Sequence, residues 1–119
     1  MKVINVKKEF RVKRNKEFQY IFKKGKSFAN RQLVIYYMKR IDNTHFRIGL
    51  SVGKKIGNAV TRNRIKRYLR QAFHELEDNI KDEYDIVIIA RAQTKDMTFH
   101  EVKRSLNHLL MKERLLLKK

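Results

Sequence analysis

The spacing of apolar residues predicts one long helix over residues 58–81 of the 119-residue chain. Its apolar residues recur every three or four positions and therefore share one face of a helix. Asn58 can cap the first turn by accepting a hydrogen bond from a backbone N–H. The helix thus has one side for a core and another for solvent or a partner. The apolar residues are Ile65, Leu69, Ala72, Phe73, Leu76 and Ile80.

Two further helices are predicted toward the ends of the chain. Over 15–24, Asn15 can act as the N-cap and Gly25 ends the helix. Residues 98–101, TFHE, form a capping box that opens a last helix. The leucines at 115–117 either cover the core or fray. The inward face of the last helix carries Phe99, Val102, Leu106, Leu109 and Leu110.

Four strands complete the pattern. Residues 27–40 predict a strand with a break near Asn30, and within it both alternating sets of side chains are apolar, so both faces are covered. Residues 46–52 alternate between apolar side chains and the small or polar set Arg47, Gly49 and Ser51. This second set is either a shallow floor on which the backbone of a partner could lie or a plain solvent face.

The connections between these elements predict one α+β domain. Residues 41–45 read as a hairpin loop, and 84–91 are apolar enough for a buried central strand. The order is α-β-β-β-α-β-α, with a mostly antiparallel four-stranded sheet packed by helices. The long helix lies between two strands, a crossover whose default hand is right. Residues 1–14 read as a flexible or loosely docked basic arm on this single domain, 1–119.

Charge narrows the class of partner. The chain has 30 Lys and Arg against 12 Asp and Glu, a net charge of +18. Such self-repulsion does not stabilise a globular protein, so a polyanionic partner is expected. The charge is uneven, because residues 1–40 hold thirteen basic residues and two Glu, whereas 71–101 hold three basic residues and eight acidic ones. The acidic segment is expected to face away from the partner.

The densest basic stretch is 54–70, which has seven Lys or Arg and no acidic residue. On the long helix, a stripe of polar and basic residues runs beside the apolar face. A solvated charged face is the ordinary interpretation, but the absence of interleaved Asp or Glu favours contact with nucleic-acid phosphates. The stripe consists of Asn63, Lys66, Arg67, Arg70 and His74.

The first predicted helix offers a second candidate surface. Phe18, Ile21 and Phe22 fall on one face of it. The residues alone favour a pair of core aromatics, and the alternative is a stacking shelf for unpaired bases beside nearby lysines.

Catalytic and metal motifs are missing from the pattern. The four His have no zinc-ligand spacing, and the carboxylates are concentrated in 71–101, apart from the cations. Without Cys there is no disulfide framework or thiolate site. We therefore expect an RNA-binding protein that carries no catalytic group. A structural RNA-binding protein, such as a ribosomal protein, and a DNA-compacting protein are the alternatives left by composition.

The run KKxGNAVxRNRxKR over 54–67 resembles the signature of the bacterial ribonuclease P protein subunit, in which Arg62-Asn63-Arg64 is the so-called RNR motif. The resemblance also takes in FxxxFxxG at 18–25, Ala29-Asn30-Arg31, Tyr36 and the strand at 86–91. It implies a left-handed crossover. It further implies a non-catalytic subunit of a phosphodiester-cleaving hydrolase, which binds ribonuclease P RNA and assists removal of the 5′ leader from precursor tRNA.

The resemblance assigns roles to individual residues. The catalyst would be the RNA, using Mg²⁺ held by RNA and substrate and by no protein metal site. Expected partners are ribonuclease P RNA and precursor tRNA, without a membrane or protein partner, in the cytoplasm. The implied RNA-binding residues are Arg62, Asn63, Arg64, Lys66, Arg67 and Arg70, with Lys54, Lys55 and Asn58 as phosphate neighbours, and the implied leader-binding cleft has Phe18, Phe22 and Tyr36.

Overall fold

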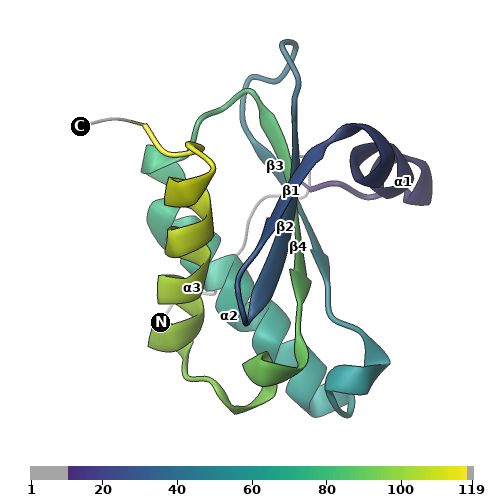
Figure 1. Ribbon diagram of the computed structural model, residues 1–119, viewed down its shortest axis with the longest axis vertical. Helices are drawn as coiled ribbons and strands as arrows, with labels where there is room; N and C mark the ends of the chain where they lie inside the picture. Colours follow the sequence, from purple (N-terminus) through teal and green to yellow (C-terminus); the bar gives the residue numbers. More distant parts are fainter. Residues whose placement is uncertain (1–10, 118–119) are drawn as a thin grey trace.

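The elements follow one another in the order that the sequence predicts. The computed structural model describes residues 11–117 (Figure 1). Three short 3₁₀ turns, η2 (Lys54–Ile56), η3 (Glu77–Asn79) and η4 (Ala92–Asp96), join the main elements. The helices and strands are α1 (Asn15–Lys24), β1 (Lys26–Ala29), β2 (Leu33–Lys39), β3 (Arg47–Ser51), α2 (Ala59–Leu76), β4 (Tyr84–Ala90) and α3 (Phe99–Lys112).

The four strands form one mixed sheet in the order β1-β2-β4-β3. The β1–β2 and β2–β4 pairs are antiparallel, whereas β3 and β4 are parallel and are joined through α2. The predicted α+β class with a mostly antiparallel sheet is confirmed. The predicted hairpin across 41–45 is wrong, because β4 lies between β2 and β3. Strand β4, which is buried on both faces over most of its length, lies between β2 and β3 instead. The left-handed sense of the β3–α2–β4 connection stays a prediction.

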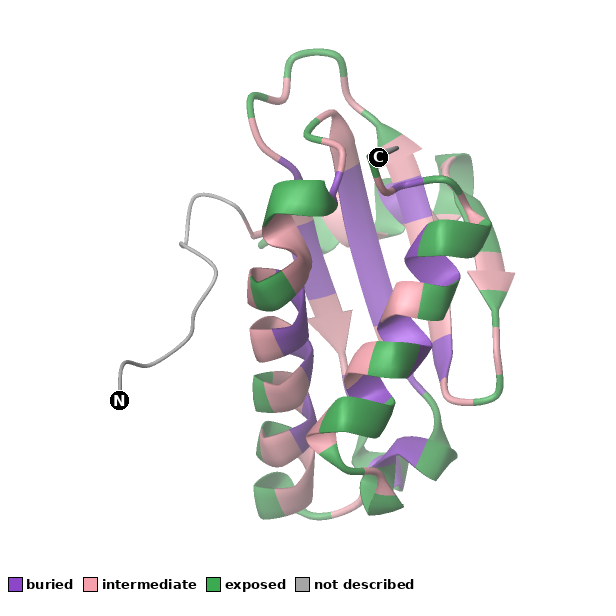
Figure 2. Cartoon of the chain, turned by 90° about the vertical axis from the view of Figure 1, so that its left-hand side faces the viewer, coloured by how far each residue is buried: buried purple, intermediate pink, exposed green. Residues whose placement is uncertain are grey.

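Helices α2 and α3 cover one face of the sheet. Figure 2 shows the two helices side by side in front of the strands, with their buried residues turned toward the sheet. The core between these layers includes Leu33 and Ile88 from the strands, Leu69 from α2 and Leu106 from α3, all fully buried. Leu115 is also fully buried, so the C-terminal leucines cover the core at this position.

Two predicted helix boundaries need correction. Helix α2 ends at Leu76 instead of residue 81, because the chain tightens into η3 and is extended at Ile80, which bridges Leu116. Ile80 is nevertheless buried, so its predicted place in the core is correct although it lies beyond the end of the helix. Asn15 is the first helical residue and not the cap. The Glu17 carboxylate instead accepts hydrogen bonds from the backbone N–H groups just before the helix.

The start of the described chain is docked on the sheet. Arg11 bridges Ile48 of β3, and the Val12 N–H donates to the Ile48 carbonyl oxygen at 2.8 Å. Val12 itself is buried. The arm predicted over 1–14 is therefore fixed at this end, and its residues 1–10 lie outside the described residues.

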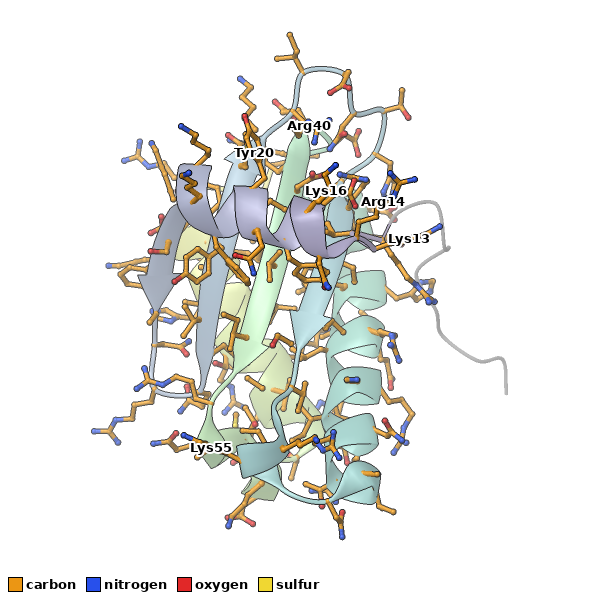
Figure 3. All side chains as sticks on the ribbon, turned by 90° about the vertical axis from the view of Figure 1, so that its right-hand side faces the viewer. Lys13, Arg14, Lys16, Tyr20, Arg40 and Lys55 are labelled. Atoms are coloured by element: carbon orange, nitrogen blue, oxygen red, sulfur yellow. The ribbon has the colours of Figure 1, made fainter. Side chains whose placement is uncertain are left out.

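Helix α1 lies across the other face of the sheet (Figure 3). Its Ile21 forms a small second cluster with Val12 and Val87, and three partly buried aromatic rings pack against this cluster, Phe18, Phe22 and Tyr36. Both faces of β2 thus pack against other parts of the chain, as predicted, although Val34, Tyr36 and Met38 on the α1 side stay partly exposed. The helix leaves the part of the sheet toward Lys55 without a covering helix (Figure 3).

Two glycines allow this close packing. A Cβ on Gly25, which ends α1, would lie 2.6 Å from the carbonyl oxygens of Ile21 and Tyr37. A Cβ on Gly49 would lie 2.7 Å from the Phe18 ring. The predicted small floor on β3 is therefore partly occupied, because Phe18 covers Gly49.

Candidate nucleic-acid interface

The basic helix α2 starts from a well-defined turn. The Asn58 Oδ1 accepts a hydrogen bond from the Thr61 backbone N–H at 2.9 Å, which confirms the predicted cap. The Arg62 Nε donates to the Gly57 carbonyl oxygen at 3.1 Å and holds that side chain against the turn. Lys54 and Lys55 are exposed on η2 just before it. This end of α2 therefore presents cations together with the partial positive charge of a helix N-terminus.

Asn58 thus has a structural role that can be separated from any contact with RNA. Asn58→Ala is expected to lower the free energy of unfolding by about 1 kcal/mol through loss of the cap, measured by denaturant titration. Asn58→Asp keeps a capping oxygen and should keep stability, while its negative charge should weaken RNA binding if a phosphate lies nearby. Equal RNA affinity of Asn58→Asp and the unchanged protein would show that no phosphate lies near this position.

The predicted RNA-binding residues of α2 point in three directions. Asn63 and Arg67 are exposed, and the Arg67 guanidinium lies 5.7 Å from the centre of the Tyr68 ring. Arg64 turns away, because its Nη2 donates to the Lys95 carbonyl oxygen of η4 at 2.6 Å. Lys66 and Arg70 turn toward β3 and line a hollow there.

This hollow brings the cations and an aromatic ring together. It has a volume of about 150 Å³, and Arg11, Phe18 and Gly49 line it with Lys66 and Arg70. Burial and the charge of Arg11 lower the pKa of Arg70 from its ordinary value. A phosphate placed here would offset this repulsion between cations. Sequence patterns did not indicate Arg11, since it lay in the predicted arm.

The three predicted cleft aromatics form a continuous group. Phe22 and Tyr36 meet edge to face with ring centroids 4.9 Å apart, and Phe18 lies 6.3 Å from Phe22. All three are partly exposed. Val34 and Ile89, paired across β2 and β4 on the same face, are also partly exposed. The group therefore forms a wall of the small cluster and also borders a partly exposed apolar surface, while the stacking of bases on it stays a prediction.

An ion-paired group beside α1 was missed by sequence reasoning. The Asp85 carboxylate of β4 is fully buried and is bound by Arg47, which also contacts Glu17 of α1. Burial raises the pKa of Glu17, but hydrogen bonds from the Lys13 and Arg14 N–H groups and from Arg47 outweigh it and lower this pKa. The only signal in the sequence was the place of Arg47 on the face opposite the core.

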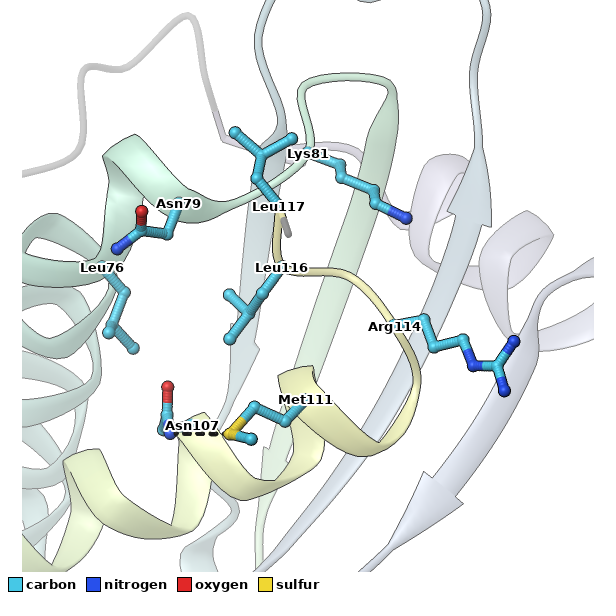
Figure 4. Close-up of a pocket in the computed structure, with 8 residues that line it drawn as sticks. All are labelled: Leu76, Asn79, Lys81, Asn107, Met111, Arg114, Leu116 and Leu117. Atoms are coloured by element: carbon cyan, nitrogen blue, oxygen red, sulfur yellow. Dashed lines mark hydrogen bonds between the residues drawn. The ribbon is translucent and has the colours of Figure 1, made fainter. Parts of the chain in front are cut away.

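Other features of the described chain are remote from this region. A larger hollow of about 890 Å³ lies between the ends of α2 and α3 (Figure 4) and contains none of the predicted site residues.

Among residues 11–117, no three or more His, Cys, Asp or Glu lie together in a way that could hold a metal ion. No helix within that range has the length and apolarity to cross a membrane.

Comparison with known proteins decides the family. The family model for ribonuclease P matches residues 6–114. The chain belongs to the ribonuclease P protein family. The ribonuclease P protein component of Oceanobacillus iheyensis is 70% identical over 111 residues, which are 93% of this chain and 92% of that protein. The same component of Listeria welshimeri is 60% identical over 114 residues, 96% of each chain.

Solved structures of the family share the fold. The Staphylococcus aureus RNase P protein has a TM-score of 0.84 at 46% identity, covering 89% of this chain and 96% of that one. The Thermotoga maritima RNase P protein has a TM-score of 0.79 at 32% identity, covering 86% and 96%. The present chain is accordingly the protein subunit of ribonuclease P, acts in tRNA processing and associates with ribonuclease P RNA. The ribosomal and DNA-compacting alternatives are thereby set aside.

Proposed function

We propose that the subunit binds ribonuclease P RNA through the basic stripe of α2 and holds the 5′ leader of precursor tRNA against α1 and the open part of the sheet. The observation that carries the proposal is the shared hollow, where Lys66 and Arg70 of the stripe meet Phe18 of the aromatic group. Cations beside aromatic rings suit single-stranded nucleic acid, because phosphates pair with the former and unpaired bases stack on the latter.

The proposed contacts fall into two sets. Lys66 and Arg70 could reach both the RNA subunit and the leader, since these two members of the stripe line the hollow that Phe18 also lines. The first set, which we assign to RNA phosphates, extends beyond the stripe to the turn before α2 and consists of Arg62, Asn63, Arg64, Lys66, Arg67 and Arg70 with Lys54, Lys55 and Asn58. The leader groove has Phe18, Phe22 and Tyr36.

We assign bond cleavage to the RNA subunit. Lys66 and Arg70 can neutralise phosphate charge, but protonated side chains of this kind cannot remove a proton from water at neutral pH. The Mg²⁺ that the reaction requires would be held by the RNA subunit and the substrate. The protein subunit would thus raise the affinity for substrate and lower the repulsion between RNA phosphates. We place this activity in the cytoplasm, where bacterial precursor tRNA is made.

The assignment is tested by cleavage of precursor tRNA over a series of Mg²⁺ concentrations. The protein is expected to lower the Mg²⁺ concentration that a bacterial ribonuclease P RNA needs, and the protein without RNA should cleave nothing. Cleavage by RNA-free protein that a single substitution abolishes would place the catalyst in the protein. An unaltered Mg²⁺ requirement would contradict the proposed role in holding RNA.

A further inference from the structure

The central strand carries a carboxylate that is fully removed from solvent. Asp85 of β4 accepts hydrogen bonds from the Arg47 Nη2 at 2.7 Å and Nε at 2.9 Å. The Asn43 Nδ2 adds a bond at 3.0 Å, and the Arg40 Nη1 lies at 3.4 Å. A buried carboxylate is tolerated only when it is well paired, and the two-point contact fixes the plane of the Arg47 guanidinium. Arg47 is thereby held in one orientation.

The remaining Arg47 nitrogen reaches the first turn of α1. Its Nη1 donates to the Glu17 Oε2 at 3.1 Å. The other Glu17 oxygen, Oε1, accepts from the backbone N–H groups of Lys13 and Arg14 at 3.1 and 3.4 Å. One chain of hydrogen bonds thus connects the buried centre of the sheet with the backbone at the start of α1. We refer to these three side chains as the Glu17–Arg47–Asp85 bridge.

The bridge lies next to the proposed leader groove. Phe18 follows Glu17 directly, and Phe22 lies one helical turn further along. The Phe18 ring covers Gly49, which is two residues from Arg47 and therefore on the same face of β3. Strand β3 accordingly holds α1 at two adjacent points, one polar and one apolar. A shift of the first turn would move both aromatic rings.

We propose that the Glu17–Arg47–Asp85 bridge positions α1, so that Glu17 and Arg47 are positioning residues for the binding of precursor tRNA. The inference rests on the proposed leader groove. In this proposal the bridge does not contact the RNA, because its charged groups pair with one another. Its effect is to keep the aromatic rings in one place before the leader arrives, which lowers the ordering cost of binding.

The test compares Glu17→Gln with the matched control Glu75→Gln. Glu75 pairs with Lys103 at 2.7 Å and joins α2 to α3 on the other face of the sheet. The two carboxylates are similarly exposed, with side chains 31% and 36% accessible. Both substitutions remove one negative charge and so raise the net charge by one, which by itself would strengthen RNA binding. Weaker binding by Glu17→Gln alone therefore cannot come from net charge.

We expect Glu17→Gln to weaken binding of precursor tRNA by the complete ribonuclease P about threefold to tenfold, because glutamine leaves a neutral hydrogen bond that is about 1 kcal/mol weaker than the charge-assisted one. Binding of mature tRNA, which lacks the leader, should not change. Backbone amides of α1 should exchange with solvent faster, while those of β4 keep their protection. The control Glu75→Gln should alter neither measurement.

A second substitution checks that the effect passes through Arg47. Arg47→Lys removes the planar fork, so one ammonium cannot serve Asp85 and Glu17 in the same way. If the bridge is one unit, the double variant Glu17→Gln, Arg47→Lys should lose little more precursor affinity than Arg47→Lys alone. Fully additive losses would contradict a single positioning unit.

Tyr36→Ala distinguishes failure of this inference from failure of the proposed groove. If Tyr36→Ala weakens precursor binding and Glu17→Gln does not, the groove stands and the positioning role of the bridge is wrong. If neither substitution weakens it, the leader does not lie on these aromatics, and the inference falls with the proposed function.

Discussion

Replacing Arg62, Lys66 and Arg67 together by alanine is expected to weaken binding of ribonuclease P RNA and to flatten its dependence on salt. Each lost phosphate contact removes roughly 0.7–0.9 from the slope of log affinity against log salt concentration, so three contacts should lower the slope by about 2–3. The affinities are measured over a series of monovalent salt concentrations. Because the Arg62 Nε also bonds the Gly57 carbonyl oxygen, the melting temperature is measured beside them.

The matched control removes the same charge elsewhere. Lys95, Arg104 and Lys112 are exposed on η4 and α3, and their replacement by alanine also lowers the net charge by three. We expect this triple variant to keep most of the salt slope. Equal slopes for both triple variants would mean that only total charge matters, and an undiminished slope in the α2 variant would show that the stripe is a solvated face.

Substitution of Tyr36 is expected to cause the second large loss of affinity, and only for tRNA that carries a 5′ leader. Stacking of a base on an aromatic ring contributes about 1–3 kcal/mol, so Tyr36→Ala should weaken binding of precursor tRNA about 5- to 150-fold. Mature tRNA should bind almost unchanged. Phe22, whose ring contacts that of Tyr36, should behave in the same way.

Phe18 provides the contrast for that experiment. Its ring lies over Gly49 and against the Val12 cluster, so Phe18→Ala removes packing as well as a stacking surface. Phe18→Ala should lower the melting temperature and weaken the binding of both precursor and mature tRNA through loss of folded protein. An equal loss for precursor and mature tRNA in Tyr36→Ala, with a lowered melting temperature, would show that Tyr36 too acts only in packing.

The sequence predicted those features that depend on residues close together in the chain. The Asn58 cap, the capping box at 98–101 and the apolar face of α2 follow from spacings of three or four residues, and each is present. The coverage of both faces of β2 was visible in the same way. Such patterns show which face of an element is buried, but they do not identify its neighbours.

Neighbours far apart in the chain account for the errors. Consecutive strands usually pair, so 41–45 read as a hairpin, although β4 separates β2 from β3. Asp85 was counted in the acidic segment expected to face away from the partner, and no pattern indicated that its carboxylate is buried against Arg47, which precedes it by 38 residues. The packing of Phe18 over Gly49 likewise joins two elements whose contact no local pattern reveals.

The central position of β4 also constrains how the protein is made. A ribosome delivers β1, β2, β3 and the basic helix before β4, and β3 has no strand partner in the sheet until residues 84–90 arrive. The β1–β2 pair can close locally, but the platform beneath α1 and α2 needs contacts of long sequence separation, which form slowly. We therefore expect nascent chains to gain organised RNA-binding surfaces only after β4 has left the ribosome, although most of their cations are exposed earlier.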